Sequence, residues 1–189
     1  MIHIYDGNNV RLRAMTTSHL PGQKRLGLRQ EYERSFEGHH VWCWDGAQHN
    51  ERRKAVYPGY KAKRLPIAED HFSQIQLFRE LLTHSPAQQC VVPKWEADDV
   101  VATLARRFAA RGIAVTCYSN DLDYLQLEAN PLIKIDGIRD RAVPPRWIPL
   151  YKAFRGDTSD NIAGVPGFGG KTWDYSNREA LQFSRVHPF

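Results

Sequence analysis

The sequence predicts an α/β fold with a mainly parallel central sheet, and two observations support this class. Short apolar, β-branched or aromatic runs recur along the chain, and the stretches between them carry apolar residues at helical spacing. Strands that alternate with helices are typical of a sheet with mainly parallel strands. The 189 residues, 42% apolar and 25% charged, are enough for one domain with an ordinary buried core.

The strands are expected where runs of this kind are bounded by polar residues. They are IHIY (2–5), VWCW (41–44), CVV (90–92), IAVTCY (113–118) and the weaker LIKI (132–135).

Two helices are expected between these runs, because each stretch places its apolar residues on one stripe. The stripe of residues 70–84 consists of Phe72, Ile75, Phe78, Leu81 and Leu82, and that of residues 96–111 consists of Val100, Leu104 and Phe108.

Charge and cysteine usage narrow the class of protein. The net charge of +5 favours a phosphate-rich partner. The three cysteines lie far apart without CxxC spacing, so we expect free thiols in a reducing compartment. No apolar run approaches the roughly 18 residues of a membrane span, and the N-terminus does not read as a leader. We therefore expect a cytoplasmic protein.

Acidic residues follow the predicted strands. Asp6 comes after the first run, Asp45 after the second, and Asp121 and Asp123 follow the fourth. The third run leads into a helix whose first turn carries Glu96, Asp98 and Asp99. Ligand sites of parallel sheets lie beyond the carboxyl ends of the strands, so we expect these side chains to converge there.

Each acid alone has a simpler explanation. Asp-Gly at 6–7 and 45–46 is common turn chemistry, and acids in a first helical turn complement the helix dipole. Together, however, converging carboxylates repel one another unless cations lie among them. Oxygen ligands without Cys or His favour magnesium or manganese over zinc.

The segment FRGDTSDNIAGVPGFGGK (154–171) joins two aspartates to a glycine-rich loop. If the segment is helical, Asp157 and Asp160 share a face and extend the acidic cluster. The loop offers unobstructed backbone N–H groups to a phosphate, with Lys171 beside them, although a surface turn explains it as well. GVPGFGGKT has the spacing of a P-loop, but the residues before it do not form a strand, so we reject that interpretation.

Basic residues with interleaved tyrosines occupy residues 51–64. Cations that meet phosphates and tyrosines that stack on bases are suited to a nucleic-acid strand, and a solvated charge run is the alternative. The residues are Arg52, Arg53, Lys54, Tyr57, Tyr60, Lys61, Lys63 and Arg64.

Taken in order, these motifs resemble the 5′ nuclease family, which comprises the 5′-3′ exonuclease domain of bacterial DNA polymerase I and the flap endonucleases of bacteria and phages. The blocks that carry the resemblance are IYDGNN (4–9), WDG (44–46), RKAVYPGYKAKR (53–64), VPKWEADDVVATLA (92–105), SNDLDYLQL (119–127) and YKAFRGDTSDNIAGVPGFGGKT (151–172). The resemblance implies a PIN-like, three-layer α/β/α fold. It implies a core at residues 1–150 with an arch or clamp at about 46–90, and a helix-three-turn-helix DNA-binding element with a short tail at 151–189.

The resemblance also implies the roles of site residues. Two Mg²⁺ or Mn²⁺ ions would be held by Asp6, Asp45, Glu96, Asp98, Asp99, Asp121, Asp123, Asp157 and Asp160. Lys61 and Arg64 match the catalytic basic pair that reaches the scissile phosphate. DNA-binding positions would be Arg53, Tyr60, Gly164, Val165, Gly167, Gly169, Gly170 and Lys171, with a K⁺ ion at the glycine-rich loop.

Three departures from the family pattern accompany the resemblance. Lys94 stands where relatives usually have glycine, and Asn120 where a small residue is common. The chain also ends soon after Thr172, where relatives continue with several helices, so we expect a weaker grip on duplex DNA.

The activity that we expect is structure-specific hydrolysis of DNA at 5′ flaps, gaps or ends, by a monomer that works alone or beside a separate DNA polymerase. The alternatives are a PIN-type ribonuclease and a DNA-binding remnant that has lost catalysis. The full acidic set argues against both, because neither requires it.

Overall fold

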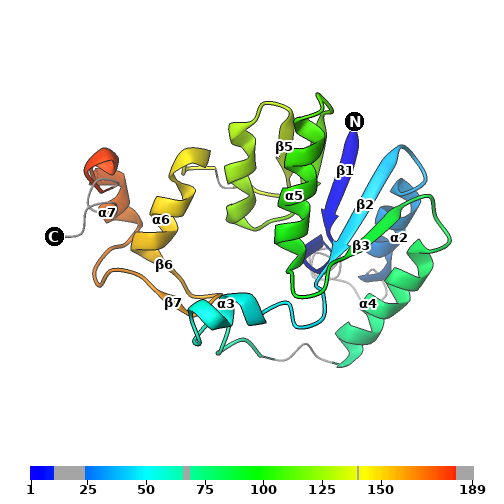
Figure 1. Ribbon diagram of the computed structural model, residues 1–189, viewed down its shortest axis with the longest axis horizontal. Helices are drawn as coiled ribbons and strands as arrows, with labels where there is room; N and C mark the ends of the chain where they lie inside the picture. Colours follow the sequence, from blue (N-terminus) through cyan, green and yellow to red (C-terminus); the bar gives the residue numbers. More distant parts are fainter. Residues whose placement is uncertain (11–23, 66–68, 140, 182–189) are drawn as a thin grey trace.

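Five strands form one parallel sheet at the centre of the molecule (Figure 1). The computed structural model describes residues 1–10, 24–65, 69–139 and 141–181. In space the strands lie in the order β3 (Gln88–Val91), β2 (His39–Trp44), β1 (Ile2–Asp6), β4 (Val115–Tyr118) and β5 (Ile133–Asp136). Every neighbouring pair is parallel. The α/β class and each of the predicted strands are therefore confirmed.

The order of the strands reverses at the centre of the sheet. The chain moves outward from β1 through β2 to β3 and then returns to place β4 on the other side of β1. Ile4 accordingly lies opposite Val41 on β2 and opposite Cys117 on β4. The carboxyl ends beside such a switch point are the usual ligand site of a parallel sheet.

Helices and short turns connect these strands and continue beyond them. They are α2 (Lys24–Arg34), α3 (Glu51–Val56), α4 (Glu69–Leu82), α5 (Ala97–Ala109), the 3₁₀ helices η1 (Leu122–Ala129) and η2 (Pro145–Trp147), α6 (Ile148–Arg155), the hairpin strands β6 (Gly156–Asp157) and β7 (Ile162–Ala163), and α7 (Gly170–Tyr175).

The two predicted helices are present as α4 and α5, but each is shorter than expected. Glu96 has an extended backbone and precedes α5. At the other end, Gly112 adopts a positive φ of 75° shortly after the helix stops, a conformation that glycine tolerates best. After α4, the Ser85 hydroxyl donates to the Leu82 carbonyl at 2.9 Å and so satisfies one free carbonyl at the helix end.

The stripe of α4 is narrower than predicted. Ile75, Phe78 and Leu82 are buried, but Phe72 is 53% exposed and Leu81 41% exposed. The buried side chains pack against the aromatic residues of β1, β2 and β4, whereas Phe72 and Leu81 lie outside that layer. Helical periodicity alone predicted an apolar face wider than the sheet covers.

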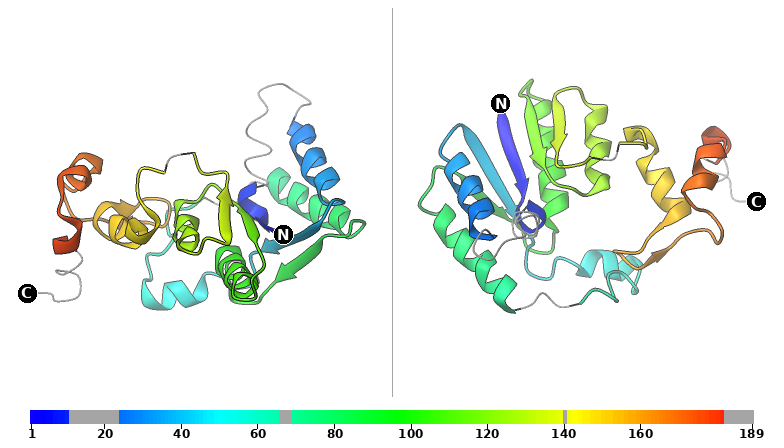
Figure 2. Two further views of the ribbon diagram at one scale, coloured as in Figure 1. Left: turned by 90° about the horizontal axis from the view of Figure 1, so that it is seen from above. Right: turned by 180° about the vertical axis from the view of Figure 1, so that it is seen from behind.

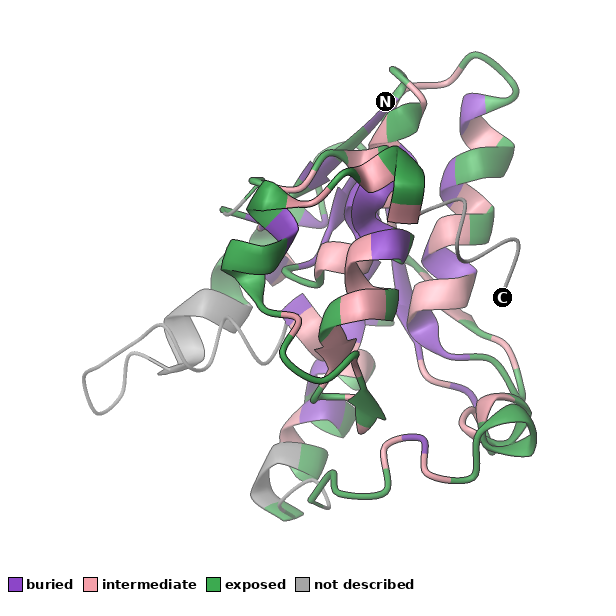
Figure 3. Ribbon diagram, turned by 90° about the vertical axis from the view of Figure 1, so that its left-hand side faces the viewer, coloured by how far each residue is buried: buried purple, intermediate pink, exposed green. Residues whose placement is uncertain are grey.

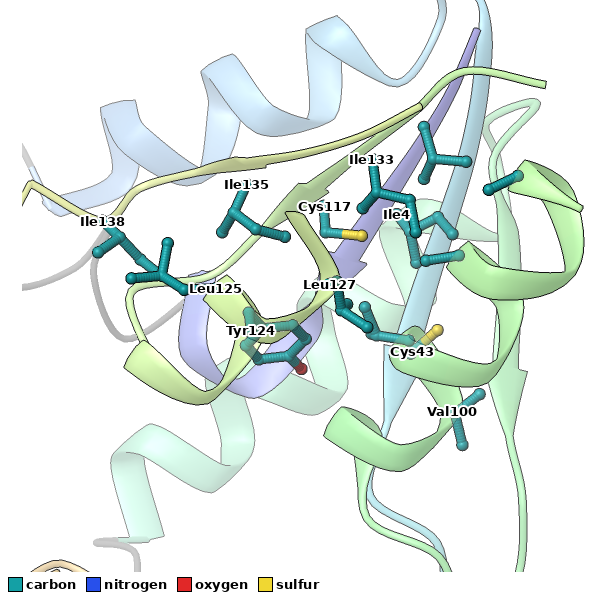
Figure 4. Close-up of a cluster of buried hydrophobic side chains, with 14 of the residues drawn as sticks. Ile4, Cys43, Val100, Cys117, Tyr124, Leu125, Leu127, Ile133, Ile135 and Ile138 are labelled. Atoms are coloured by element: carbon teal, nitrogen blue, oxygen red, sulfur yellow. The ribbon is translucent and has the colours of Figure 1, made fainter. Parts of the chain in front are cut away.

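Side chains from the two faces of the sheet form separate cores. On one face Ile4, Cys43, Cys117 and Ile135 pack with residues of α5 and η1 (Figure 4). On the other face aromatic rings stack across the strands, with Tyr5 centred 4.2 Å from Trp42 and 4.4 Å from Tyr118. Figure 2 shows α2 and α4 on this second side and α5 on the first. The predicted three-layer α/β/α arrangement is confirmed.

The C-terminal part has its own small core of Trp147, Leu150 and Trp173. The predicted boundary at residue 150 falls inside α6. A helix-three-turn-helix element is not confirmed here, because the β6–β7 hairpin and a loop separate α6 from the six-residue α7. Figure 1 shows α6 and α7 at one end of the molecule, with the hairpin beside α3.

The burial pattern separates the sheet from the residues around α3. Strands β1, β2 and β4 are largely buried, whereas the segment from α3 to residue 65 is mainly exposed (Figure 3). None of the helices in the described ranges is long and apolar enough to cross a membrane.

Candidate active site at the carboxyl edge of the sheet

Asp6 and Asp45 lie at the carboxyl ends of neighbouring strands, as predicted. Asp6 is buried and accepts hydrogen bonds from the Asn9 backbone N–H at 3.2 Å and the Tyr124 hydroxyl at 3.1 Å. Asp45 accepts from the backbone N–H of Ala97 at 2.8 Å. It thereby satisfies one of the free N–H groups at the start of α5, which fixes that helix against the strand end.

Asparagine side chains join these strand ends. Asn8 Nδ2 donates to Asp45 at 2.8 Å. Asn9 Nδ2 donates to Asn120 Oδ1 at 2.6 Å, and the Asn120 backbone N–H donates to Asn9 Oδ1 at 3.0 Å. We did not predict these roles from the sequence, although each asparagine closely follows a strand that ends at this edge. The contact also explains a polar residue at position 120.

Arg53 gathers the acids at the start of α5. Its guanidinium contacts the buried Glu96, lies 3.4 Å from Asp98 and lies 3.2 Å from Asp99. Arg53 was predicted to bind phosphate, and here it neutralises three predicted metal ligands. Its pKa is raised because attraction to Asp98 and Glu96 outweighs the opposing effect of burial.

Glu96 also holds the basic segment that precedes α4. Lys61 Nζ donates to Glu96 at 2.8 Å, and the Tyr60 hydroxyl donates to the same carboxylate at 3.0 Å. From the sequence we expected Tyr60 to stack on bases. Its side chain is only 5% exposed, however, so its ring is not available for stacking. Tyr57, which is 42% exposed, is the accessible tyrosine of this segment.

Lys152 gathers the second group of acids. Its Nζ lies 2.7 Å from both Asp123 and Asp157 and 3.9 Å from Asp121. This α6 lysine is a site residue that we did not predict. Its place in YKAFRGD, five residues before Asp157, was the sequence feature that pointed to it. The path of the chain beyond the end of α6 had to be known before Lys152 could be placed beside the acids.

Asp157 and Asp160 do not share a helical face, contrary to the expectation for a helical segment. They belong to the β6–β7 hairpin, where Asp157 Oδ1 accepts from the Ser159 backbone N–H at 2.9 Å. This local turn competes with helix formation. Arg64 lies 3.8 Å from Asp160, so the predicted catalytic pair contacts the acids from two sides, Lys61 at Glu96 and Arg64 at the hairpin.

Burial disfavours the charged form of several of these acids. It raises the pKa of Asp6 to about 7, against hydrogen bonds from Asn9 and Tyr124. Burial likewise raises the pKa of Asp123, although Lys152 opposes the shift. Burial would also raise the pKa of Asp157, but hydrogen bonds from Lys152 and Ser159 outweigh it and lower the pKa to about 2.

The same balance holds at the α5 start and the hairpin. Burial raises the pKa of Asp98 and of Asp99, and Arg53 opposes the shift in each case. Burial raises the pKa of Asp160 against the charge of Lys61. The site therefore needs positive charge to keep its carboxylates ionised.

The protein's own cations supply part of that charge. Arg53, Lys61 and Lys152 lie between the acids, and within the described ranges no three Asp, Glu, His or Cys side chains stand together as a metal-binding group. The donor set still fits a hard divalent cation, because every acid in the site offers carboxylate oxygen.

The glycine-rich loop runs from the end of β7 to α7, and its glycines differ in their surroundings. A Cβ at Gly164 would meet the Arg155 carbonyl carbon at 2.2 Å, so this glycine packs against the end of α6. Val165 N–H donates to the Phe154 carbonyl at 2.7 Å. Open space surrounds the Cβ positions of the other three predicted glycines, Gly167, Gly169 and Gly170. Lys171 follows in the first turn of α7.

Known proteins resemble this chain in sequence. A 5′-3′ exonuclease of Aquifex aeolicus is 36% identical over 133 residues, which cover 64% of this chain and 46% of that protein. A DNA polymerase I of Caldicellulosiruptor bescii is 30% identical in an alignment 196 residues long, and the alignment covers 89% of this chain and 23% of that protein. This chain thus spans less than half the length of either relative.

Solved structures share the fold. A bacteriophage T5 flap endonuclease in complex with DNA and metal ions superposes with a TM-score of 0.66 at 20% identity, covering 98% of this chain and 74% of that one. The profile of the family described as "5′-3′ exonuclease, N-terminal resolvase-like domain" matches residues 25–143. Because this match covers more than half of the chain, including the segment that carries Lys61 and the acidic turns at Glu96 and Asp121, the chain belongs to the family of 5′-3′ exonuclease N-terminal resolvase-like domains.

Proposed function

We propose that this protein is a divalent-metal-dependent, structure-specific 5′ nuclease that hydrolyses DNA at 5′ flaps, gaps or ends during replication or repair. The observation that carries this proposal is that carboxylates from five segments lie at one edge of the sheet, where Arg53, Lys61 and Lys152 join them. Asp6 interacts electrostatically with Asp45 and Asp98, and Lys152 joins the acids after β4 to the hairpin. Family membership and the names of the relatives support it.

Two Mg²⁺ or Mn²⁺ ions would be held by the nine carboxylates predicted from the sequence. Bound there, such ions supply an activated water and stabilise the leaving oxygen of a phosphodiester. A K⁺ ion at the glycine-rich loop before α7 belongs to the same proposal.

The basic side chains would orient the DNA and balance charge. Lys61 is held beside the acids by Glu96, in a position to meet charge that develops on a phosphate. Arg53 and Lys152 keep the carboxylates ionised before the substrate and ions arrive. Arg64 is more exposed and would contact the backbone of the incoming strand.

The substrate and setting follow from the same proposal. The partner is DNA with a 5′ flap, gap or end, and the protein would act as a cytoplasmic monomer, alone or beside a separate DNA polymerase. The relatives named DNA polymerase I and the T5 structure with DNA support DNA as the substrate.

The test is cleavage of 5′-labelled flap, nicked duplex, single-stranded DNA and a matching RNA, each with Mg²⁺, Mn²⁺ or EDTA. We expect metal-dependent cutting of flap DNA near the junction. In the Asp121→Asn/Asp123→Asn variant we expect no cutting and DNA affinity equal to or above wild type, because less negative charge faces the phosphates. Asparagine at 121 keeps an acceptor for the Asp123 N–H, which the Asp121 carboxylate now binds at 3.0 Å.

The matched control is Asp136→Asn, which changes an exposed acid at the end of β5. It should cut like wild type. Turnover by the double variant would disprove the site assignment, and faster cutting of RNA than of DNA would favour a ribonuclease. A protein that binds flap DNA with Mg²⁺ but never cuts it would be a DNA-binding remnant.

A further inference from the structure

A cavity of about 770 Å³ lies beside the carboxylates, between the α3 segment, the start of α5 and the β6–β7 hairpin. This volume is within the range of about 300–1,000 Å³ that small-molecule sites occupy. Asp98, Asp99 and Asp160 line one part of it. The proposed metal and phosphate chemistry does not account for the rest of its wall.

One part of that remaining wall is aromatic and apolar. It includes Trp95, Tyr57, Val56 and Ile162, and the exposed fractions of these side chains are 37%, 42%, 88% and 41%. The other four tryptophans of the chain are at most 7% exposed. An exposed indole beside further apolar side chains, within reach of a phosphate site, is a surface on which a nucleobase stacks.

Cations border the same wall. The Arg52 guanidinium stacks on one face of the Trp95 ring, with its carbon 3.5 Å from the ring centre, so a base would take the other face of the ring or the place of this guanidinium. Lys94 and Arg53 also line the cavity. A nucleotide needs both kinds of group, an aromatic face for its base and positive charge for its phosphate. The cavity places the two together, next to the carboxylates.

The backbone holds Lys94 and Trp95 at this place. Lys94 has a positive φ of 66°, which is uncommon for a residue with a side chain. Its N–H donates to the Ala47 carbonyl at 2.7 Å, and the Gly46 N–H donates to the Trp95 carbonyl at 3.0 Å. A Cβ at Gly46 would lie 1.9 Å from the Val92 carbonyl oxygen, so the two loops are in close contact. A strained backbone conformation that several surrounding contacts hold in place is typical of functional positions.

We propose that this cavity is a nucleobase subsite in which the unpaired nucleotide next to the cleaved phosphodiester stacks its base on Trp95, with Lys94 contacting its backbone phosphate. Inside a duplex both faces of a base are covered by its neighbours, so a base must leave the stack before it can lie on Trp95. The subsite therefore selects for a flap or frayed end. This inference rests on the proposed nuclease function.

The decisive experiment pairs a protein variant with a DNA variant. Dissociation constants are measured in EDTA, so that no strand is cut, for flap DNA and for the same DNA with an abasic residue at the unpaired nucleotide next to the junction. For wild type, we expect the abasic residue to weaken binding about 5- to 150-fold, the range for loss of one stacked base. Trp95→Ala should weaken binding of intact flap DNA to the same extent and show no further loss with the abasic DNA. Trp95→Phe should retain most of the difference.

The matched control is Phe36→Ala, which removes a half-exposed ring before the start of β2, at the opposite edge of the sheet. It should keep the full abasic effect. Circular dichroism verifies that each variant is folded. Because Trp95 is the most exposed tryptophan, intact flap DNA should quench wild-type fluorescence, and abasic DNA should quench it less.

Lys94 has a separate test. Lys94→Gly keeps the backbone conformation, since glycine readily adopts positive φ. We expect the slope of log affinity against log salt concentration to fall by about one for this variant, with the abasic effect retained. An unchanged slope would show that Lys94 does not contact a phosphate of the bound nucleotide.

The outcomes separate this inference from the proposed function. An equal abasic effect in wild type and Trp95→Ala, or no effect in wild type, overturns the subsite even if the protein cuts flap DNA. A protein that shows the coupled loss but never cuts retains the subsite and loses the nuclease proposal. Failure to bind flap DNA at all overturns both.

Discussion

Lys61 illustrates how single residues serve this site. Its backbone has a positive φ of 54°, and its ammonium group donates to the buried Glu96. Burial of a carboxylate costs folding free energy unless a cation lies beside it. In the proposed function the same ammonium group also meets charge that develops on a phosphate. One side chain can therefore stabilise the folded site and act on substrate.

Lys61→Ala should slow the chemical step far more than it weakens binding. Loss of a donor that stabilises charge only in the transition state lowers the rate by about 10²- to 10³-fold. The measurements are the single-turnover cleavage rate in Mg²⁺ and the dissociation constant for flap DNA in EDTA. Lys63→Ala, two residues along the same segment and exposed, is the matched control and should change the rate little. Equal losses in the cleavage rate and in DNA affinity would show that Lys61 contributes to DNA binding and not to the chemical step.

At the scale of elements, the basic segment and the hairpin are joined by hydrogen bonds. Asn161 Nδ2 donates to the Gly59 carbonyl at 2.8 Å, and the Tyr57 hydroxyl donates to the Asn161 carbonyl at 2.9 Å. The Lys61 N–H donates to the Asp160 carbonyl at 3.0 Å. The hairpin therefore holds in place the residues that carry Lys61, although about a hundred residues separate them in the chain.

Asn161→Gly should loosen this junction. Asn161 has a positive φ of 59°, so glycine keeps the conformation while the Nδ2 hydrogen bond is lost. One such bond contributes about 1 kcal/mol, and we expect the Lys61 amide to exchange hydrogen about 5-fold faster. Hydrogen exchange read at this amide is the measurement.

The control for that substitution is Gln48→Gly. Gln48 is exposed and has a similar φ of 57°, so it reports the effect of glycine alone. Exchange at Lys61 that is equal in the two variants would show that the Asn161 side chain does not hold the junction.

At the scale of the whole molecule, the carboxyl edge holds more acid than base. Nine predicted ligands meet Arg53, Lys61, Lys152 and the exposed Arg64, so the folded state concentrates negative charge at one edge although the chain carries a net charge of +5. Repulsion among carboxylates that no cation neutralises destabilises the folded state, and bound cations relieve it.

Mg²⁺ should therefore stabilise the protein. For one site at ten times its dissociation constant, binding contributes about 1.4 kcal/mol, which raises the melting temperature by about 3 to 6 °C in a chain of this size. Differential scanning fluorimetry with MgCl₂, with NaCl of equal ionic strength and with EDTA measures this shift. Asp121→Asn/Asp123→Asn should shift less. An equal rise with NaCl would mean that screening, not metal binding, is responsible.

The arrangement of the sheet was largely predictable from local signals. The runs at 2–5, 41–44 and 113–118 are strands because β-branched and aromatic residues suit a pleated, buried environment. The acids after them were predicted to converge because parallel strands end at the same edge. The burial of only one part of the α4 stripe was not predictable, since it depends on which residues the sheet presents to the helix.

By itself, the sequence determined the strands, the acids that end them and the family to which the chain belongs, because runs of apolar residues, turn residues and motif spacing are local properties. Only the tertiary structure decided that Lys152 joins Asp123 to Asp157, that Tyr60 is buried against Glu96, and that residues 156–163 form a hairpin. These features depend on contacts between residues far apart in the chain. Their energies are set by the path of the whole backbone rather than by any local pattern.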